Sequence, residues 1–191
     1  IYDDSMWLID LVENLLSVTR IEEGRMQIRQ SAELVDEVIK EALKHTGQSR
    51  TGRTIKVEEE DELILAKMDA RLIVQVLINL IGNAVKYTPQ GTDITVRVKK
   101  EKAENAERSQ VIISVCDLGN GIPDDRKERV FDMFYTGSDQ VADSRRSLGL
   151  GLGLCRSIIN AHGGKIWISD NIPHGAVVTF TLPAEEVALN E

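Results

Sequence analysis

The residues best suited to chemistry begin with a glycine run. Residues 148–154 read LGLGLGL, and residues 155–161 have the periodicity of a helix. Backbone N–H groups at a helix start attract anions, and glycine has no Cβ to block a close approach. The run indicates a phosphate site. The alternative is a segment in which the glycines serve only packing. It matches neither the G-x-G-x-x-G dinucleotide fingerprint, because residue 154 is leucine, nor a P-loop.

Two amides and an ammonium group form a second cluster. Asn79 and Asn83 are four residues apart and share a helical face, and Lys86 follows one turn later. Such groups are costly to bury on an apolar helix unless they have partners. Amide oxygens are hard ligands that suit Mg²⁺, which usually shares its shell with substrate phosphates that Lys86 could also meet. Capping of the helix end is the alternative, and it stays open above all for Asn79.

A carboxylate follows what the pattern indicates is a buried strand. Residues 116–123 read CDLGNGIP, so Asp117 stands beside the open backbone of Gly119 and Gly121. An ionised aspartate only accepts hydrogen bonds. Asp117 would therefore suit the exocyclic amine of adenine and would repel the oxygen that guanine carries there. The alternative is a β-turn with Asp117 as the turn former.

Helices and strands are predicted on both sides of these groups in the sequence. Amphipathic patterns predict helices over 1–22 with Gly24 as C-cap, from Ser31, from Asp69 as N-cap, and over 124–130. Strands are predicted at 53–58, 63–67, 93–99, 111–116, 165–169 and 176–182, and polar residues 136–147 predict a mobile loop. The expected fold is α+β, with one amphipathic helix before an antiparallel-leaning mixed sheet that carries helices on one face.

Composition narrows the class of protein. The chain has 191 residues, of which 42% are apolar, and a net charge of −8 with scattered basic residues, which argues against nucleic-acid binding. No apolar run is long enough to span a membrane and no signal peptide is visible. Cys116 and Cys155 lack metal-site spacing and are expected to be buried free thiols. The start at Ile1, in mid-pattern and without Met, indicates a fragment of something longer.

Taken together and in this order, these blocks resemble the catalytic domain of sensor histidine kinases, within the wider family shared with gyrase, Hsp90 and MutL. Residues 1–24, with LLSVTRIEEG, resemble the second helix of the family's dimerisation and phosphoacceptor hairpin, and residues 25–191 resemble its ATP-binding catalytic domain. VADSRRSLGLGLGLCRSIINAHGG and MDARLIVQVLINLIGNAVKYTP narrow the resemblance to Kdp-type potassium-responsive sensor kinases. Further matches are IINAHGG and GAVVTFTLP, and the four named motifs are NLIGNAVKYTP (79–89, N box), DLGNGIP (117–123, G1 box), FDMFY (131–135, F box) and GLGLGL (149–154, G2 box).

The resemblance implies a two-layer α/β sandwich, the Bergerat ATP-binding fold, with ATP and Mg²⁺ as cofactors. It implies Asn83 as the Mg²⁺ ligand, with Asn79 as a second candidate. Lys86 would contact phosphate, Tyr87 would pack near adenine or ribose, and Asp117 would bind the adenine amine. The full set implied for the nucleotide is Asn79, Asn83, Lys86, Tyr87, Asp117, Gly119, Gly121, Ile122, Gly149, Leu150, Gly151, Leu152 and Gly153.

The same resemblance implies a lid hinged at the glycine run. Phe131 and Phe134 would anchor its near end, although phenylalanines in so apolar a segment also suit a plain core. Arg145 and Arg146 could reach the terminal phosphate, or simply be solvated loop charges.

Hydrolysing relatives in this family place a glutamate one turn before the Mg²⁺-binding asparagine, as a general base. Here that residue is Asn79, whose amide cannot take a proton, so we expect transfer to a protein nucleophile. The family's acceptor is a histidine followed by an acidic residue, a pattern that His45, His162 and His174 all lack. The chain should therefore bind ATP without its own phosphoacceptor, and no catalytic residue is expected within it.

The expected function is transfer of the γ-phosphoryl group of Mg-ATP to a histidine on a helix of the same or a sister kinase chain, and then to an aspartate of a response regulator receiver domain, in potassium or osmotic signalling. The full-length protein is expected to be a homodimer in the bacterial inner membrane. This part would be cytoplasmic, with no membrane or nucleic-acid contact. The alternatives are a conformational ATPase, a non-catalytic nucleotide-binding interaction module, and an anti-sigma-type Ser/Thr kinase, which the helix at 1–22 disfavours.

Overall fold

A computed structural model of the chain describes residues 9, 12, 13, 16, 19, 20, 23, 24, 27–46, 54–60, 63–102, 109–133, 135 and 151–185. Within these residues the helices with defined bounds are α2 (Val35–His45), α4 (Ala70–Tyr87), α5 (Gly151–Ala161) and the 3₁₀ helix η1 (Arg129–Phe131). The strands are β1 (Ser31–Leu34), β2 (Ile55–Glu59), β3 (Leu65–Met68), β4 (Ile94–Lys102), β5 (Ser109–Cys116), β6 (Ile166–Asp170) and β7 (Ala176–Glu185).

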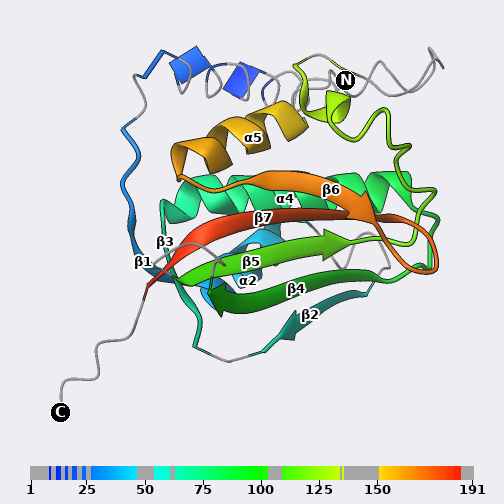
Figure 1. Cartoon of the computed structure of the whole chain (residues 1–191), viewed down its shortest axis with the longest axis horizontal. Helices are drawn as coiled ribbons and strands as arrows, with labels where there is room; N and C mark the ends of the chain where they lie inside the picture. The colour runs from blue at the N-terminus through cyan, green and yellow to red at the C-terminus, as the bar shows by residue number, and fades with distance from the viewer. Residues whose placement is uncertain are drawn as a thin grey trace.

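The strands form one mixed sheet whose order is β1-β3-β7-β5-β4-β2, with β6 also paired to β7 (Figure 1). Within the described residues only β2 and β4 pair in parallel, and every other pair is antiparallel. The first half of β7 lies between β5 and β6, with Val177 opposite Cys116, and its far end pairs with β3. The predicted α+β fold, a mixed sheet with helices on one face, is confirmed.

The hydrophobic core lies between the sheet and the three α-helices, which contact one another in the order α2, α4, α5. Figure 1 shows α4 and α5 running along the sheet. The inner face predicted for α4 is buried at every position: Leu72, Ile73, Val76, Leu77, Leu80 and Ile81. Burying a side chain of this size contributes about 1.5–3 kcal/mol, so this face alone fixes α4 against the sheet.

The second helix begins at Val35, and the prediction that it begins at Ser31 is wrong. Residues 31–34 form an edge strand instead, with Ser31 opposite Met68 and Leu34 opposite Leu65. The Val35 N–H then donates to the carbonyl of Ile64 at 3.0 Å, which fixes the turn from strand to helix. The predicted inner face of this helix is buried at Val35, Val38, Ile39 and Ala42, while Leu43 is half-buried.

The short helix predicted over 124–130 is a series of turns that ends in η1, so that prediction is wrong. The carbonyl of Pro123 accepts hydrogen bonds from the N–H groups of both Arg126 (2.9 Å) and Lys127 (3.2 Å), so bonds that span three and four residues are mixed in this segment. The Lys127 ammonium pairs with Asp124 and reaches Asp170 of β6 at 2.9 Å. This tie to the sheet holds the segment in its irregular path.

Other boundaries are close to those predicted. The strands expected at 53–58 and 63–67 are β2 and β3, which pair with β4 and with β1 and β7 and not with each other. Of the helix predicted over 1–22, the described residues Ile9, Val12, Glu13, Leu16, Thr19 and Arg20 are helical. Gly24 lies in a turn with φ +64°, as expected of a residue that ends a helix. The rest of 1–22 and all of 136–147 lie outside the described residues.

Asp69 joins three parts of the fold. It precedes α4 as predicted, but its side chain makes no capping bond. Instead, Oδ2 accepts hydrogen bonds from the Arg29 N–H (3.1 Å) and the Arg71 guanidinium (3.3 Å). Burial alone would raise the pKa of the Asp69 carboxyl, but these bonds outweigh it and lower the pKa. The carboxylate thus ties the segment before β1 to the start of α4.

His162, which follows α5, completes this junction. Its Nε2 accepts a hydrogen bond from the Asp69 N–H at 3.0 Å, so Nδ1 carries the proton and donates to the Ile158 carbonyl at 2.7 Å. Both Asp69 and His162 are only 3% exposed. The buried histidine therefore has a structural role that joins the end of α5 to the start of α4.

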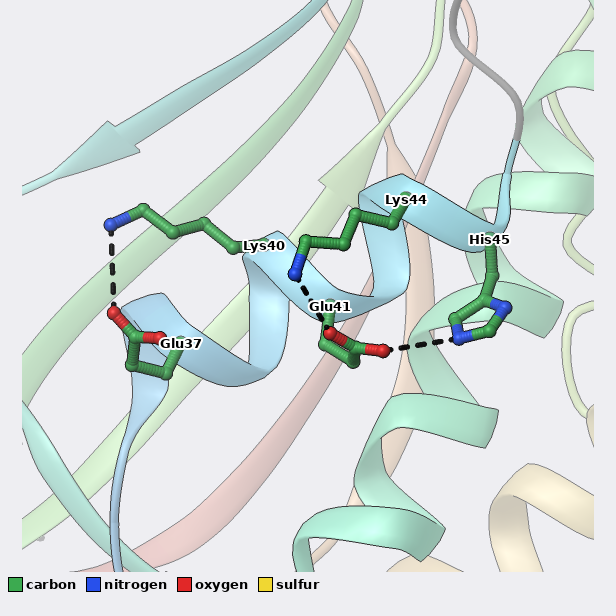
Figure 2. Close-up of polar contacts among 5 residues, drawn as sticks. All are labelled: Glu37, Lys40, Glu41, Lys44 and His45. Carbon is green, nitrogen blue, oxygen red and sulfur yellow. Dashed lines mark hydrogen bonds and ion pairs between the residues drawn. The ribbon is translucent and has the colours of Figure 1, made fainter.

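The outer face of α2 is a solvated surface of charged residues (Figure 2). Lys40 lies 3.7 Å from Glu37, and Glu41 lies 3.2 Å from both Lys44 and His45. These side chains are exposed, and pairs of this kind contribute little to stability. These exposed charges keep the outer face of α2 in contact with water.

Glu59, at the end of β2, is a half-buried carboxylate that faces α2. Its Oε1 is buried and has no hydrogen-bond partner within the described part of the chain. Burial raises the pKa of this carboxyl, the nearby Asp36 carboxylate raises it further, and Lys40 opposes the change. Glu59 is therefore more costly to ionise in the folded protein than in the unfolded chain.

We expect Glu59→Gln to raise the free energy of unfolding at neutral pH by an amount on the order of 1 kcal/mol. At low pH the wild-type carboxyl is protonated in both the folded and the unfolded state. Because its folded-state pKa is raised, stability is lost as the pH rises through the folded pKa. The variant should lack that loss, which urea unfolding at pH 4.5 and 7.5 would measure. Glu58→Gln is the control, because Glu58 is exposed and pairs with Arg97 at 2.9 Å. A destabilised Glu59→Gln at neutral pH would contradict the assignment.

Candidate functional site

Helix α4 carries the polar residues around which the candidate site is built. Asn79 and Asn83 are half-buried, whereas Lys86 and Tyr87 are exposed. The Lys86 ammonium lies 5.1 Å from the centre of the Tyr87 ring, so the last turn presents a cation over an aromatic face. One side of α4 is thus apolar and packed, while its other side offers amides, a cation and an aromatic ring.

Asn79 contacts the start of α5. Its Oδ1 lies 3.8 Å from the place that a Cβ on Gly151 would occupy. Its Nδ2 is buried and has no hydrogen-bond partner among the described residues. The neighbouring Cys155 is fully buried, and this burial raises the pKa of its thiol to about 12. As predicted, both Cys116 and Cys155 are buried free thiols.

The glycine run enters α5 earlier than predicted. The helix begins at Gly151 and not at Cys155, so Gly151 and Gly153 lie in its first turn. Gly153 is buried, and a Cβ there would lie 2.8 Å from the Met133 Sδ and 3.1 Å from the Phe131 carbonyl oxygen. Because Gly153 has no side chain, α5 can pack closely on η1. Leu152 is half-buried against the core, and Gly149 and Leu150 lie outside the described residues.

Phe131 belongs to the core and is also tied to α5. It is 3% exposed, and the Arg156 guanidinium lies 4.1 Å from the centre of its ring. Arg156 in turn pairs with Glu128 at 2.7 Å. The plain-core alternative therefore describes the position of Phe131. Phe134, Arg145 and Arg146 lie outside the described residues.

Asp117 follows β5 directly, at the strand end where the sequence pattern predicts it. Its Oδ1 accepts two backbone hydrogen bonds, from Gly119 N–H at 2.9 Å and from Ala176 N–H at 3.1 Å. Within the described residues Oδ2 has no such bond. One carboxylate oxygen is therefore fixed by the protein, and among the described residues the other remains a free acceptor.

The segment after Asp117 lies against the end of α4. A Cβ on Gly119 would be 3.0 Å from the Tyr87 carbonyl oxygen and 3.1 Å from the Thr88 Cγ2. Gly121 has φ +73° and faces the Gly175 carbonyl, and Ile122 packs on the core. The close approach of Gly119 is what brings the carboxylate to α4.

Three predicted groups thus meet along one helix. The glycine run lies at Asn79, and the Asp117 segment lies at Tyr87, eight residues further along α4. Eight helical residues span about 12 Å, a length comparable with an extended nucleoside triphosphate. In the described part of the chain no three His, Cys, Asp or Glu residues are placed to hold a metal ion. A cation bound here would need amide oxygens and the ligand's own oxygens.

The turn between β6 and β7 contributes residues that sequence reasoning missed. The Asn171 Nδ2 donates to the Asp117 carbonyl at 2.7 Å, and the His174 Nδ1 donates to the Gly119 carbonyl at 3.0 Å. The pattern N-x-P-x-G from Asn171 to Gly175 signals a turn but not the partner of that turn. An open depression of about 420 Å³ separates this turn from residues 120–124.

Comparison with known proteins identifies similar sequences and structures. Residues 68–186 match the family described as histidine kinase-, DNA gyrase B-, and HSP90-like ATPase. The sensor protein KdpD of Clostridium acetobutylicum is 41% identical over 185 residues, which cover 97% of this chain and 20% of that protein. The chain therefore spans about a fifth of the length of that relative.

Two solved structures are similar in fold. The nucleotide-free catalytic domain of histidine kinase ThkA has a TM-score of 0.67 at 31% identity, over 81% of this chain and 95% of that one. ThkA in complex with the response regulator protein TrrA has a TM-score of 0.69 at 28% identity, over 93% of this chain and 49% of that one. Among the helices described here, none combines the length and apolarity needed to cross a bilayer.

We expect Gly175→Ala to destabilise the protein by at least about 3 kcal/mol, because the change combines a clash with backbone strain. A Cβ at Gly175 would lie 2.0 Å from the Asp117 carbonyl oxygen, and φ is +112°. Gly163→Ala is the matched control, since φ is +75° there but nothing lies within 4 Å of a Cβ. It should lose only about 1–2 kcal/mol. Equal losses in thermal unfolding would contradict the close approach of Gly175 to Asp117.

Proposed function

The chain belongs to the histidine kinase-, DNA gyrase B- and HSP90-like ATPase family and is homologous to histidine kinase catalytic domains. We propose that it binds Mg-ATP and transfers the γ-phosphoryl group to a histidine on a separate helix, in the same or a sister kinase chain. The phosphoryl group would then pass to an aspartate of a response regulator. The observation that carries the proposal is the meeting of Asn79, Gly151, Tyr87, Gly119 and Asp117 along α4.

The nucleotide would lie along α4 with its base at Asp117. The free Oδ2 of Asp117 accepts the exocyclic amine of adenine, and the Tyr87 ring packs beside the base or the ribose. The triphosphate extends toward Asn79 and the start of α5, where the helix dipole favours negative charge. Lys86 adds a cation on the exposed side. Gly121, Ile122, Leu152 and Gly153 serve this site by shaping the backbone and core around it.

The residues present suit a magnesium ion. The Asn83 amide is half-buried and makes no hydrogen bond to another described residue, so its oxygen is free to act as a hard ligand. Asn79 is the second candidate, one turn away. When bound, Mg²⁺ neutralises phosphate charge and helps to align the transferred group. The two amides would hold the ion and orient the phosphates without taking part in proton transfer.

The choice of nucleophile follows from Asn79. An amide is no general base, so water near the γ-phosphate is not activated from this position. The three histidines of the chain are poor acceptors, because none precedes an acidic residue and each is engaged: His45 with Glu41, His162 with Asp69 and Ile158, and His174 with Gly119. The acceptor is therefore a histidine of another helix, in the same or a sister kinase chain.

The rest of the protein is proposed by analogy with its relatives. Residues 1–24 would be the second helix of a dimerisation hairpin and residues 25–191 the catalytic domain of a homodimer. The resemblance to Kdp-type kinases implies a membrane-bound sensor in potassium or osmotic signalling with this part in the cytoplasm, and the similarity to the sensor protein KdpD supports the sensor role. The complex of ThkA with TrrA supports a response regulator as the partner.

A phosphotransfer assay tests the proposal. The chain is mixed with γ-labelled ATP, Mg²⁺ and a separate helical hairpin that carries a histidine followed by glutamate. We expect acid-labile label on the hairpin and none on the same hairpin with that histidine changed to alanine. Phosphate release without any acceptor would favour a conformational ATPase, and absence of ATP binding by calorimetry would favour a non-catalytic interaction module.

We expect Asn83→Ala to remove the dependence of ATP affinity on Mg²⁺, because the variant loses the amide oxygen proposed to hold the ion. Calorimetric titration of ATP with Mg²⁺ and with EDTA gives both affinities. Asn160→Ala is the control, because it removes an amide at an exposed position on another helix, α5. Unchanged Mg²⁺ dependence in Asn83→Ala would place the metal elsewhere.

A further inference from the structure

The carbonyl of Asp117 is held from two sides by the turn that joins β6 to β7. The Asn171 Nδ2 donates to this oxygen at 2.7 Å. Gly175 lies against the same oxygen, so closely that a Cβ there would be 2.0 Å away. The Asp117 N–H donates to the Ala176 carbonyl at 2.9 Å, and the Ala176 N–H donates back to Oδ1. The position of Asp117 thus depends on residues more than 50 positions further along the chain.

The side-chain amide of Asn171 has its two ends committed to different roles. Its Oδ1 accepts a hydrogen bond from the Ile172 N–H at 2.9 Å, while its Nδ2 donates to Asp117. Its own N–H donates to the Gly175 carbonyl at 3.0 Å, which closes the turn. Because the acceptor on one side is a carbonyl and the donor on the other is a backbone N–H, the amide orientation is fixed by its partners.

We infer that Asn171 is a positioning residue for adenine recognition, which it serves by holding the backbone of Asp117. With the turn in place, Ala176 N–H and Gly119 N–H fix Oδ1, and Oδ2 is aimed at the base. Without the Asn171 donor, the Asp117 carbonyl loses its side-chain anchor and the carboxylate can turn away from the amine. Asn171 touches neither nucleotide nor metal in this scheme. The inference rests on the proposed binding of adenine at Asp117.

The sharpest variant is Asn171→Asp, which keeps the shape and the acceptor but replaces the donor with a carboxylate oxygen that repels the Asp117 carbonyl. Calorimetry compares Mg-ATP with the Mg-bound triphosphate of purine riboside, which lacks the exocyclic amine. We expect ATP affinity to fall about five- to tenfold, with the purine nucleotide much less affected. Both ligands carry the same triphosphate, so added negative charge cancels in the comparison. Asn171→Ala should change the same selectivity to a smaller extent.

Two controls separate positioning from general damage. Asn160→Ala, the loss of an exposed amide on α5, should change neither affinity. In an Asp117→Asn background, Asn171→Asp should cause little further loss of ATP affinity, because residues that act through one group are not additive. Thermal unfolding of each variant checks that the fold persists, and Asn171→Ala takes over the test if Asn171→Asp does not fold.

Equal weakening of both nucleotides, or unchanged selectivity in both Asn171 variants, would overturn the inference and leave the turn a structural brace alone. Failure of the proposed adenine site has a different signature. In that case Asp117→Asn by itself would bind ATP and the purine nucleotide as the wild-type chain does.

Discussion

The antiparallel pairing of β5 with β7 determines where Asp117 lies and therefore where the candidate site forms. It places Cys116 opposite Val177, so Asp117 and Ala176 meet just beyond the paired residues and exchange hydrogen bonds. β7 also pairs with β6 and β3, so the strand that organises the sheet also fixes the carboxylate. Asp117 is bonded directly to Ala176 of β7, so a shift in the position of β7 would move the Asp117 carboxylate as well.

The sequence predicted those parts of the fold in which local pattern and tertiary packing agree. α4 is the clearest case, since each apolar residue of its predicted inner face is buried. The apolar spacing of Leu34 continues that of α2 and therefore predicts a helix from Ser31, whereas pairing with the edge of β3 makes Ser31–Leu34 a strand. The start of α5 differed for a related reason: the glycines of the run are poor helix formers alone, but Gly153 fits against Phe131 and Met133.

Site residues can be predicted from the sequence where their own segment has a recognisable residue type and spacing. A residue whose role depends on contact with a distant segment cannot. Asn79, Asn83 and Asp117 stand out by residue type and spacing, and the structure places their segments along one helix. Asn171 has no such signal, since a turn asparagine before a proline resembles many others, and its partner is distant in sequence. Register between β5 and β7 decides that contact, and register is a property of the folded sheet.

The buried junction of Asp69, His162 and the Arg29 N–H has a mechanical consequence. The backbone that leads into β1 is fastened to the residue that precedes one helix and, through an imidazole, to the end of another. The same hydrogen bonds therefore hold the start of α4, the end of α5 and the backbone before β1 together. Loss of the Asp69 or His162 side chain would therefore loosen the ends of both helices that carry the candidate site at once.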